Sequence, residues 1–426
     1  MTRNKKIPDA QKTVLGNGIK VLTERIPTMR SVALGIMVGA GSACEEEKNL
    51  GISHFIEHMT FKGTPTRSAF QIAKELDAVA GKINAYTGKE YTAYLSVILD
   101  EYIDVALDVL SDIFLNSLYD KKEVELEKGV VLEEIKMYED TPDERIHDIF
   151  AELILGGHPI GKSTLGNTET VSSIKREDIL NYRKLHYLPD NIIISVAGNI
   201  SHNDIVKRVE SYFKKLKGKT IQLKEVLPVI KSNIKFVPKK TKQVHICLGT
   251  KGISILDKRR YAFSALDNIL GGSMSSKLFQ EIREKRGLAY SIYSYNAPFK
   301  NFGVFSICAG IDKKNLIGVT ELTLKELKEL KKQGITKDEL KRTKDFLKGS
   351  LVLGLESTAS RMSWLARSEF HYNRILTIDE IFTEVDKVSQ DDIIELSNEC
   401  FKDEYLNLAA IGDFKEDEQP IKELRC

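Results

Sequence analysis

The apolar positions of the chain switch repeatedly between the spacing of strands and the spacing of helices. Near the start, Asn17-Gly18 separates two β-rich runs, which predicts a hairpin because both residues tolerate the positive φ of a tight turn. In residues 50–60 apolar side chains recur every three or four positions, which predicts an amphipathic helix. By the same criteria, strands are predicted over 31–38 and 91–97, and helices over 69–80, 102–114, 121–138 and 142–155.

The chain also carries an internal repeat with a long period. Residues 171–198 align without a gap with residues 385–412, and each segment predicts a helix, a buried strand and a terminal glycine. Residues 120–123 and 336–339 are a second matching pair, and both are typical of an acidic, capped helix start. The period is far longer than that of solenoid repeats, so it indicates a duplicated domain.

The repeat predicts an α+β fold made of two structurally similar α/β-roll lobes, each a mixed sheet packed with helices. Residues 1–215 are expected to form the N-terminal domain and residues 233–426 the homologous C-terminal domain. The lysine-rich segment 216–232 is the predicted linker between them.

Composition and charge exclude several classes of protein. Among 426 residues, 63 basic side chains balance 61 acidic ones, so the net charge of +2 indicates no nucleic-acid partner. No stretch reaches the roughly 18 apolar residues of a membrane span. Residues 1–12 lack the apolar segment of a secretory signal, so a cytoplasmic protein is expected.

The cysteines suggest neither cross-linking nor metal binding. Their number, five, is odd, and no two of them have C-x-x-C spacing. We therefore expect neither a disulfide framework nor a cysteine metal site, and a reducing compartment fits best.

Candidate chemistry lies in the helix predicted over 50–60, which contains the pentad His54-Phe55-Ile56-Glu57-His58. Residues at i, i+3 and i+4 share one helix face, so two imidazoles and one carboxylate are expected together. Two histidines four apart can bind one Zn²⁺, and Glu57 beside the metal can accept a proton from the attacking water. The alternative is a helix whose histidines only pack or face solvent.

A catalytic zinc needs a third protein ligand, and the helix predicted over 121–138 is rich in carboxylates. Glu127 and Glu134 are seven residues apart and therefore lie on one face, two turns from each other. Glu123, Glu125, Glu133 and Glu139 are also present, and charge alone does not select among them.

The segment His54–Thr64, HFIEHMTFKGT, resembles the signature of the pitrilysin–insulysin family of inverzincin metallopeptidases. Within it the chain resembles the catalytic subunit of the mitochondrial processing peptidase and its bacterial homologues. The resemblance implies one Zn²⁺ per chain, held by His54, His58 and Glu134. It also implies that Glu127 supports the metal site without being a main ligand.

Two further motifs carry the resemblance. Residues 81–87 are similar to the family's G-x-x-N-A-x-T segment, which implies that Asn84 and Ala85 bind the substrate backbone along an edge strand. Arg283 and Tyr290 match its R-x6-Y element, which implies that they bind substrate and stabilise the oxyanion. Without the resemblance, the first motif predicts only a turn before a strand, and Arg283 is an ordinary surface residue.

The second copy of the repeat lacks the metal ligands. In the frame of the repeat, the positions of His54, His58, Glu127 and Glu134 are taken by Phe263, Asp267, Thr343 and Ser350. The N-terminal domain is therefore expected to be the catalytic one.

Together these observations predict a zinc metalloendopeptidase that hydrolyses peptides or unfolded, presequence-like segments inside a chamber. The resemblance implies a homodimer, with Arg283 and Tyr290 acting from the partner chain. One alternative is a non-enzymatic core or partner subunit of a processing-peptidase-like assembly. The other is an unrelated α+β protein in which the pentad helix is purely structural.

Overall fold

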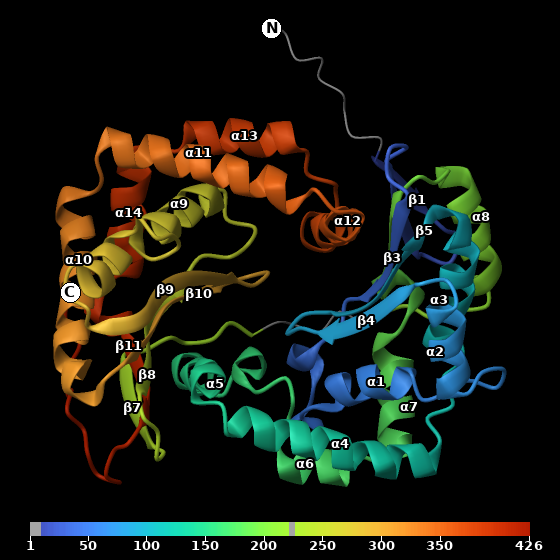
Figure 1. Ribbon diagram of the computed structural model, residues 1–426, viewed down its shortest axis with the longest axis horizontal. Helices are drawn as coiled ribbons and strands as arrows, with labels where there is room; N and C mark the ends of the chain where they lie inside the picture. The colour runs from blue at the N-terminus through green and yellow to red at the C-terminus, as the bar shows by residue number, and fades with distance from the viewer. Residues whose placement is uncertain (1–9, 221–225) are drawn as a thin grey trace, which may run out of the picture. The chain divides into compact units, whose positions relative to one another are not determined.

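The computed structural model describes residues 10–220 and 226–426, and the chain divides into two compact units (Figure 1). The first unit comprises the described residues within 1–135, 163–224 and 352–377. The second comprises those within 136–162, 225–351 and 378–426. Residues 1–9, where no secretory signal is expected, and residues 221–225 of the predicted linker lie outside the described residues.

The first unit is built on a six-stranded mixed sheet with the order β1-β2-β6-β3-β5-β4. Only the β2–β6 pair is parallel. The predicted hairpin joins the first two strands, and Gly18 in its turn has φ 105°. The strands are β1 (Ala10–Val14), β2 (Lys20–Arg25), β3 (Ser31–Val38), β4 (Lys82–Thr87), β5 (Thr92–Leu99) and β6 (Ile192–Gly198).

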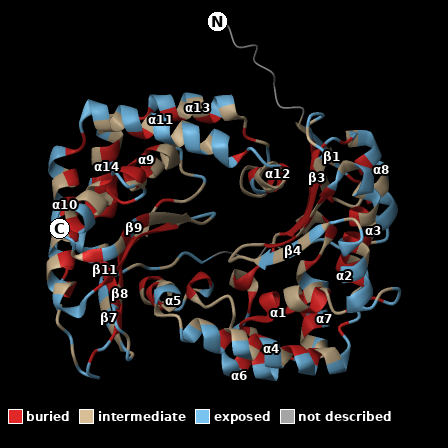
Figure 2. Ribbon diagram, viewed as in Figure 1, coloured by how far each residue is buried: buried red, intermediate tan, exposed pale blue. Residues whose placement is uncertain are grey.

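Helices pack on both faces of this sheet, and the buried residues concentrate between helices and strands (Figure 2). Phe55, Tyr94 and Phe114 belong to the main core, whereas Met37 and Leu365 lie in a smaller core on the other face, beneath α12. The helices are α1 (Ile52–Thr60), α2 (Ala69–Asp77), α3 (Ile103–Asn116), α4 (Lys121–Glu139), α6 (Thr168–Ser173), α7 (Arg176–His186), α8 (His202–Phe213) and α12 (Thr358–Tyr372).

The second unit is built on a five-stranded sheet with the order β7-β11-β8-β10-β9. Its strands are β7 (Asn233–Pro238), β8 (Val244–Gly252), β9 (Ala289–Pro298), β10 (Gly303–Ile311) and β11 (Asn407–Gly412). Its helices are α5 (Pro142–Leu155), α9 (Arg260–Leu270), α10 (Leu316–Gln333), α11 (Lys337–Gly354), α13 (Ile378–Lys387), α14 (Gln390–Cys400) and a π-helical turn (Phe279–Glu284).

The two sheets confirm the predicted duplication. The order β7-β11-β8-β10-β9 repeats the order β2-β6-β3-β5-β4, with one parallel pair, β7–β11, at the same place. The aligned segments of the repeat are α7 with β6 and α14 with β11, and the second matching pair begins α4 and α11. The fold is therefore α+β with two related units, as the repeat predicts.

The units are not the contiguous halves that the repeat alone predicts. Residues 136–162, which include α5, belong to the second unit, where α5 packs on β8 and β11. Residues 352–377, which include α12, belong to the first unit, where α12 packs on β3 and β6. The long helices α4 and α11 carry the chain from one unit into the other, and no local pattern of apolar residues indicates that exchange.

The expectation that the cysteines are not cross-linked is wrong for one pair. Cys247 of β8 lies directly opposite Cys308 of β10, with 4.3 Å between the Cα atoms, and the two form a disulfide. They are 61 residues apart in sequence, so only the strand register brings them together. Cys44, Cys400 and Cys426 are free.

None of the helices in the described part of the chain combines the length and the apolar character that crossing a bilayer requires.

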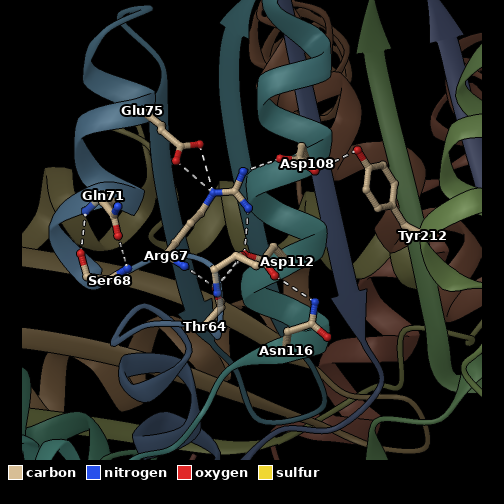
Figure 3. A network of polar contacts seen from close by, with 10 residues as sticks. Thr64, Arg67, Ser68, Gln71, Glu75, Asp108, Asp112, Asn116 and Tyr212 are labelled. Carbon is tan, nitrogen blue, oxygen red and sulfur yellow. Dashed lines mark hydrogen bonds and ion pairs between the residues drawn. The ribbon is translucent and has the colours of Figure 1, made fainter.

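A polar network anchors the turn that follows α1 (Figure 3). The guanidinium of Arg67 binds Glu75 of α2 at 3.0 Å, Asp112 of α3 at 2.8 Å, and Asp108 of α3. The hydroxyl of Thr64 donates to the same carboxylate of Asp112 at 2.7 Å. Because Arg67 is largely shielded from solvent, this network holds the end of the segment His54–Thr64 against α3.

Replacing Arg67 tests the importance of this anchor. Arg67→Ala leaves three neighbouring carboxylates without their cation, so we expect the free energy of unfolding to fall by about 3 kcal/mol. Arg67→Lys keeps the positive charge but lacks the planar guanidinium with its several N–H donors, so an intermediate loss of unfolding free energy is expected. Urea unfolding followed by circular dichroism measures both.

The matched control is Arg30→Ala, because Arg30 pairs with Asp100 on an exposed surface, where solvent screens the pair and its loss changes stability little. Equal losses for Arg67→Ala and Arg30→Ala would show that the network does not hold the turn.

Candidate metal centre

Helix α1 is held at its start by a buried carboxylate. The backbone N–H groups of Gly51 and Ser53 donate to Glu45 at 2.7 and 2.8 Å. These N–H groups have no partner within the helix, so the carboxylate satisfies them. Burial raises the pKa of Glu45 to about 7 against the effect of these two donors.

The sequence of α1 separates its apolar face from its polar face. Ile52, Phe55, Ile56 and Met59 are fully buried in the main core of the first unit. This packing turns His54, Glu57 and His58 away from the core, which is the arrangement that the pentad spacing predicts.

The structure brings His54, His58 and Glu134 together. The Nε2 atoms of His54 and His58 lie 3.8 and 3.6 Å from the two carboxylate oxygens of Glu134, and one ligand atom from each residue lies within 4.8 Å of the others. These separations exceed a hydrogen bond. They are close to the roughly 3.4 Å between two ligands of one tetrahedral metal, each about 2.1 Å from it. The three residues therefore fit a single Zn²⁺.

Glu127 fixes the orientation of one of these imidazoles. The Nδ1–H of His58 donates to Oε1 of Glu127 at 2.9 Å, and the ammonium of Lys62 pairs with Oε2. Burial disfavours the charge of Glu127, but these two partners hold the pKa of Glu127 below its usual value. With the proton on Nδ1, the Nε2 lone pair of His58 points toward Glu134 and is available to a metal.

The two imidazoles differ in electrostatic environment. Burial, together with the neighbouring His58, lowers the pKa of His54 to about 4, so its ring is neutral near pH 7. Burial also disfavours the charge of His58, but Glu127 and Glu134 outweigh it and raise the pKa of that ring. Because a ligand imidazole must be neutral, protons compete with a metal mainly at His58.

Glu57 lies beside this cluster and is not one of its three ligands. The hydroxyl of Thr87, at the end of β4, donates to Oε2 of Glu57 at 2.5 Å. Burial raises the pKa of Glu57, which brings a carboxylate closer to the range of a general base at neutral pH. Thr87 thus joins the edge strand to the pentad helix.

Thr87 and Lys62 are two residues to which the sequence assigned no role. Thr87 is the last residue of the G-x-x-N-A-x-T segment. Lys62 lies in the segment His54–Thr64, four residues after His58. The motifs contained both residues, but only the structure shows that Thr87 contacts Glu57 and that Lys62 pairs with Glu127.

The predicted substrate strand is β4, the last strand of its sheet. Its side chains alternate between exposed and half-buried, with Asn84 exposed and Ala85 half-buried. The amide oxygen of Asn84 accepts a hydrogen bond from the backbone N–H of Ala85 at 2.9 Å. That N–H is thereby satisfied on the edge of the sheet, where an added strand would otherwise bind it.

Arg283 and Tyr290 lie in the second unit, and their roles stay predictions. Arg283 is in the π-helical turn, with its guanidinium 4.7 Å from the ring centroid of Phe279. Tyr290 is the second residue of β9, and its side chain is 77% exposed.

The helices of the second unit that correspond to α1 and α4 carry no ligand set. Phe263 of α9 is fully buried, and Asp267 accepts a hydrogen bond from Ser294 at 2.5 Å. Thr343 and Ser350 lie on α11. In the described part of this unit, the residues close enough to share a metal are His147, Cys247 and Cys308, which lie on other elements.

Comparison with protein families gives two matches that follow each other along the chain. Residues 20–168 match the model described as insulinase, peptidase family M16, and residues 173–347 match the model described as the peptidase M16 inactive domain. The pentad, Glu127 and Glu134 all lie within the first match.

Curated relatives match over nearly their whole length. A Bacillus subtilis protein named an uncharacterized zinc protease is 43% identical over 391 residues, which is 91% of this chain and 95% of the relative. A Streptomyces coelicolor protein of the same description is 36% identical, over 96% of this chain and 91% of the relative.

Solved structures show the same fold. A protease from Helicobacter pylori superposes with a TM-score of 0.87 at 23% identity, covering 96% of this chain and all of that one. A Pseudomonas fluorescens structure described as a peptidase M16 inactive domain gives a TM-score of 0.89 at 20% identity, over 97% of this chain and all of that one.

Zinc binding by neighbouring variants tests the ligand set. Glu134→Gln removes a ligand, so we expect zinc affinity to fall by more than the roughly 10–100-fold that loss of a supporting residue causes. For Glu127→Gln, the loss of zinc affinity should lie within that range. Competition with a fluorescent chelator measures both affinities.

Glu133→Gln is the matched control, because Glu133 is the adjacent carboxylate on the same helix and is exposed. It should bind zinc as the unaltered protein does. Similar losses for Glu133→Gln and Glu134→Gln would remove Glu134 from the ligand set.

Proposed function

Because this chain belongs to peptidase family M16, the insulinase family, we propose that it is a zinc-dependent metalloendopeptidase of the inverzincin type. The observation that carries the proposal is the cluster of His54, His58 and Glu134, with Glu57 held beside it by Thr87. The names of the curated relatives, zinc proteases, support the same metal and reaction class.

In this proposal one Zn²⁺ per chain is held by His54, His58 and Glu134, with Glu127 and Lys62 maintaining the tautomer of His58. When bound there, zinc would supply Lewis-acid chemistry, polarising a carbonyl and lowering the pKa of water. Glu57 accepts a proton from the attacking water and later passes it to the leaving amine.

The substrate is proposed to be an extended peptide segment that adds to β4. Asn84 releases the N–H of Ala85, and the edge of the strand then pairs with the substrate backbone. Only a peptide or an unfolded, presequence-like segment can present a free backbone in this way. Pairing through the backbone would give affinity with little selectivity for the substrate's sequence.

Arg283 and Tyr290 are proposed to bind the substrate and stabilise the oxyanion from the partner chain of a homodimer. The support is their match to the R-x6-Y element and the exposed position of Tyr290 in the second unit. The paired chains would enclose a chamber that admits unfolded segments, and a cytoplasmic location is part of the proposal.

Glu57→Gln tests the catalytic assignment. The variant keeps all three ligands, so it should retain zinc while peptide hydrolysis falls by about 10²–10⁴-fold. Thr87→Val keeps the carboxylate but removes its hydrogen bond, so a smaller loss with an altered pH profile of kcat is expected. Cleavage of a peptide library, combined with zinc analysis of the same samples, measures these effects.

Full hydrolysis by Glu57→Gln would exclude Glu57 as the general base. A zinc-loaded, unaltered protein that cleaves no peptide would instead favour the role of a non-enzymatic partner subunit.

A mixture of two inactive variants tests the proposed dimer. A Glu57→Gln chain paired with an Arg283→Ala chain contains one site with an intact Glu57 that faces the partner's intact arginine. If Arg283 acts between chains, dissociating and reassociating the mixture should restore up to about half of the activity per heterodimer, whereas each variant alone stays inactive. No recovery in proven heterodimers would place Arg283 and Glu57 of one chain in the same site.

A further inference from the structure

A second cluster of reactive side chains lies on one face of the sheet of the second unit. Ile246 and Leu248 of β8 belong to the apolar core, so Cys247 between them points to the opposite face. Cys308 lies directly across on β10 and points the same way. On this face Phe150 of α5 covers Gly249, so the cysteines lie beneath α5.

His147 of α5 is the titratable side chain in contact with both sulfur atoms. Its Nδ1 lies 3.9 Å from Sγ of Cys247 and 3.8 Å from Sγ of Cys308. Tyr295 and Tyr293 of β9 lie on either side of the ring, with their hydroxyls 3.0 Å from Nδ1 and Nε2. Burial lowers the pKa of His147, so the ring is neutral and can accept a proton.

The cluster has one accessible side. Both cysteines are buried, with exposed fractions of 0% and 3%. His147 is half-buried, and Tyr293 beside it is 40% exposed. A small neutral molecule that reaches the ring of His147 is therefore one side chain away from the sulfur atoms.

We propose that Cys247 and Cys308 form a reversible thiol–disulfide site that hydrogen peroxide oxidises, with His147 as the proton acceptor for the reacting thiol. The structure holds the oxidised form. The site belongs to the second unit, whereas the proposed zinc ligands belong to the first, and nothing in the proposed peptidase reaction uses it.

The oxidation proceeds in two balanced steps. His147 takes the proton of one thiol, the thiolate attacks an oxygen of hydrogen peroxide, and the O–O bond breaks. This leaves a sulfenic acid, and the departing hydroxide takes the proton of His147 to form water. The second thiol then attacks the sulfenic sulfur, the S–S bond forms, the S–O bond breaks and a second water leaves. A dithiol reductant reverses the change and is itself oxidised to a disulfide.

Metal binding is the competing use of His147, Cys247 and Cys308, and the geometry disfavours it. A structural zinc site uses four protein ligands, whereas the described residues here provide three within ligand distance. The facing register of the two cysteines suits a direct bond between their sulfur atoms.

The test uses the full chain, reduced with a dithiol, desalted and exposed to equimolar hydrogen peroxide. Samples are alkylated at intervals and analysed by intact and peptide mass spectrometry. We expect the loss of two alkylatable thiols and a linked Cys247–Cys308 peptide, while Cys44, Cys400 and Cys426 stay alkylated. These three cysteines are internal controls, and equal or faster oxidation at any of them would overturn the proposal.

Variants separate the role of His147 from simple proximity of the cysteines. His147→Gln should slow formation of the bond by roughly tenfold, because less thiolate is present at neutral pH. Cys247→Ser should let Cys308 accumulate as a sulfenic acid that a dimedone probe traps, even if His147→Gln folds poorly. Cys400→Ser, which changes another buried cysteine, should oxidise at the unaltered rate.

Two results would contradict the assignment. One is an unchanged oxidation rate in a folded His147→Gln variant. The other is a thiolate-to-cobalt charge-transfer band when the reduced protein binds Co²⁺, because the imidazole and carboxylate ligands of the first unit give no such band. Neither measurement depends on peptidase activity.

Discussion

The candidate centre depends on the alignment of two helices, α1 and α4. One imidazole, that of His58, contacts two glutamates of α4 that lie two turns apart: Nδ1 contacts Glu127 and Nε2 faces Glu134. Seven residues of helix rise by roughly 10.5 Å, so the ring of His58 must lie between these two carboxylates. A shift of one turn of either helix would separate the ring from one of them. The packing of α1 and α4 is therefore the constraint on which the site is built.

The contacts around α1 stabilise its alignment with α4. Glu45 binds the first N–H groups of the helix, and its apolar face is buried in the core. Beyond its last turn, Thr64 and Arg67 connect the chain to α3. A helix of nine residues has little stability of its own, so these contacts at both ends and along one face hold it in place.

The duplicated sheet supports two different outcomes. Both units use the same strand order, yet the candidate ligand positions differ in the second unit: Phe263 of α9 is buried, Asp267 accepts a hydrogen bond, and Ser350 of α11 is exposed. The second unit has instead acquired a disulfide beneath α5 and the exposed Tyr290 on an edge strand. Since the fold is shared, the difference in chemistry comes from single side chains and not from architecture.

Much of the fold could be predicted because its signals are local. The Asn17-Gly18 turn, the helix over 142–155 and the aligned segments of the repeat each depend on neighbouring residues, and the structure confirms them. Predicting Glu134 and not Glu133 as the third ligand required the family resemblance. Periodicity shows which residues share a helix face but not which face meets the metal. The pentad itself predicted the shared face of His54, Glu57 and His58.

The remaining features depend on long-range register, which a single sequence does not show. The bond between Cys247 and Cys308 needs the pairing of β8 with β10. The contact of Thr87 with Glu57 needs the position of β4 beside α1. The exchange of residues 136–162 and 352–377 between the units likewise depends on contacts between residues distant in sequence, which the pattern of apolar positions does not predict.

Anomalous diffraction from crystals of the zinc-loaded protein, measured on both sides of the zinc absorption edge, tests the proposed metal site most directly. We predict one strong peak per chain, between Nε2 of His54, Nε2 of His58 and the carboxylate of Glu134. A chain without zinc at that point, or with zinc held only by other residues, would contradict it.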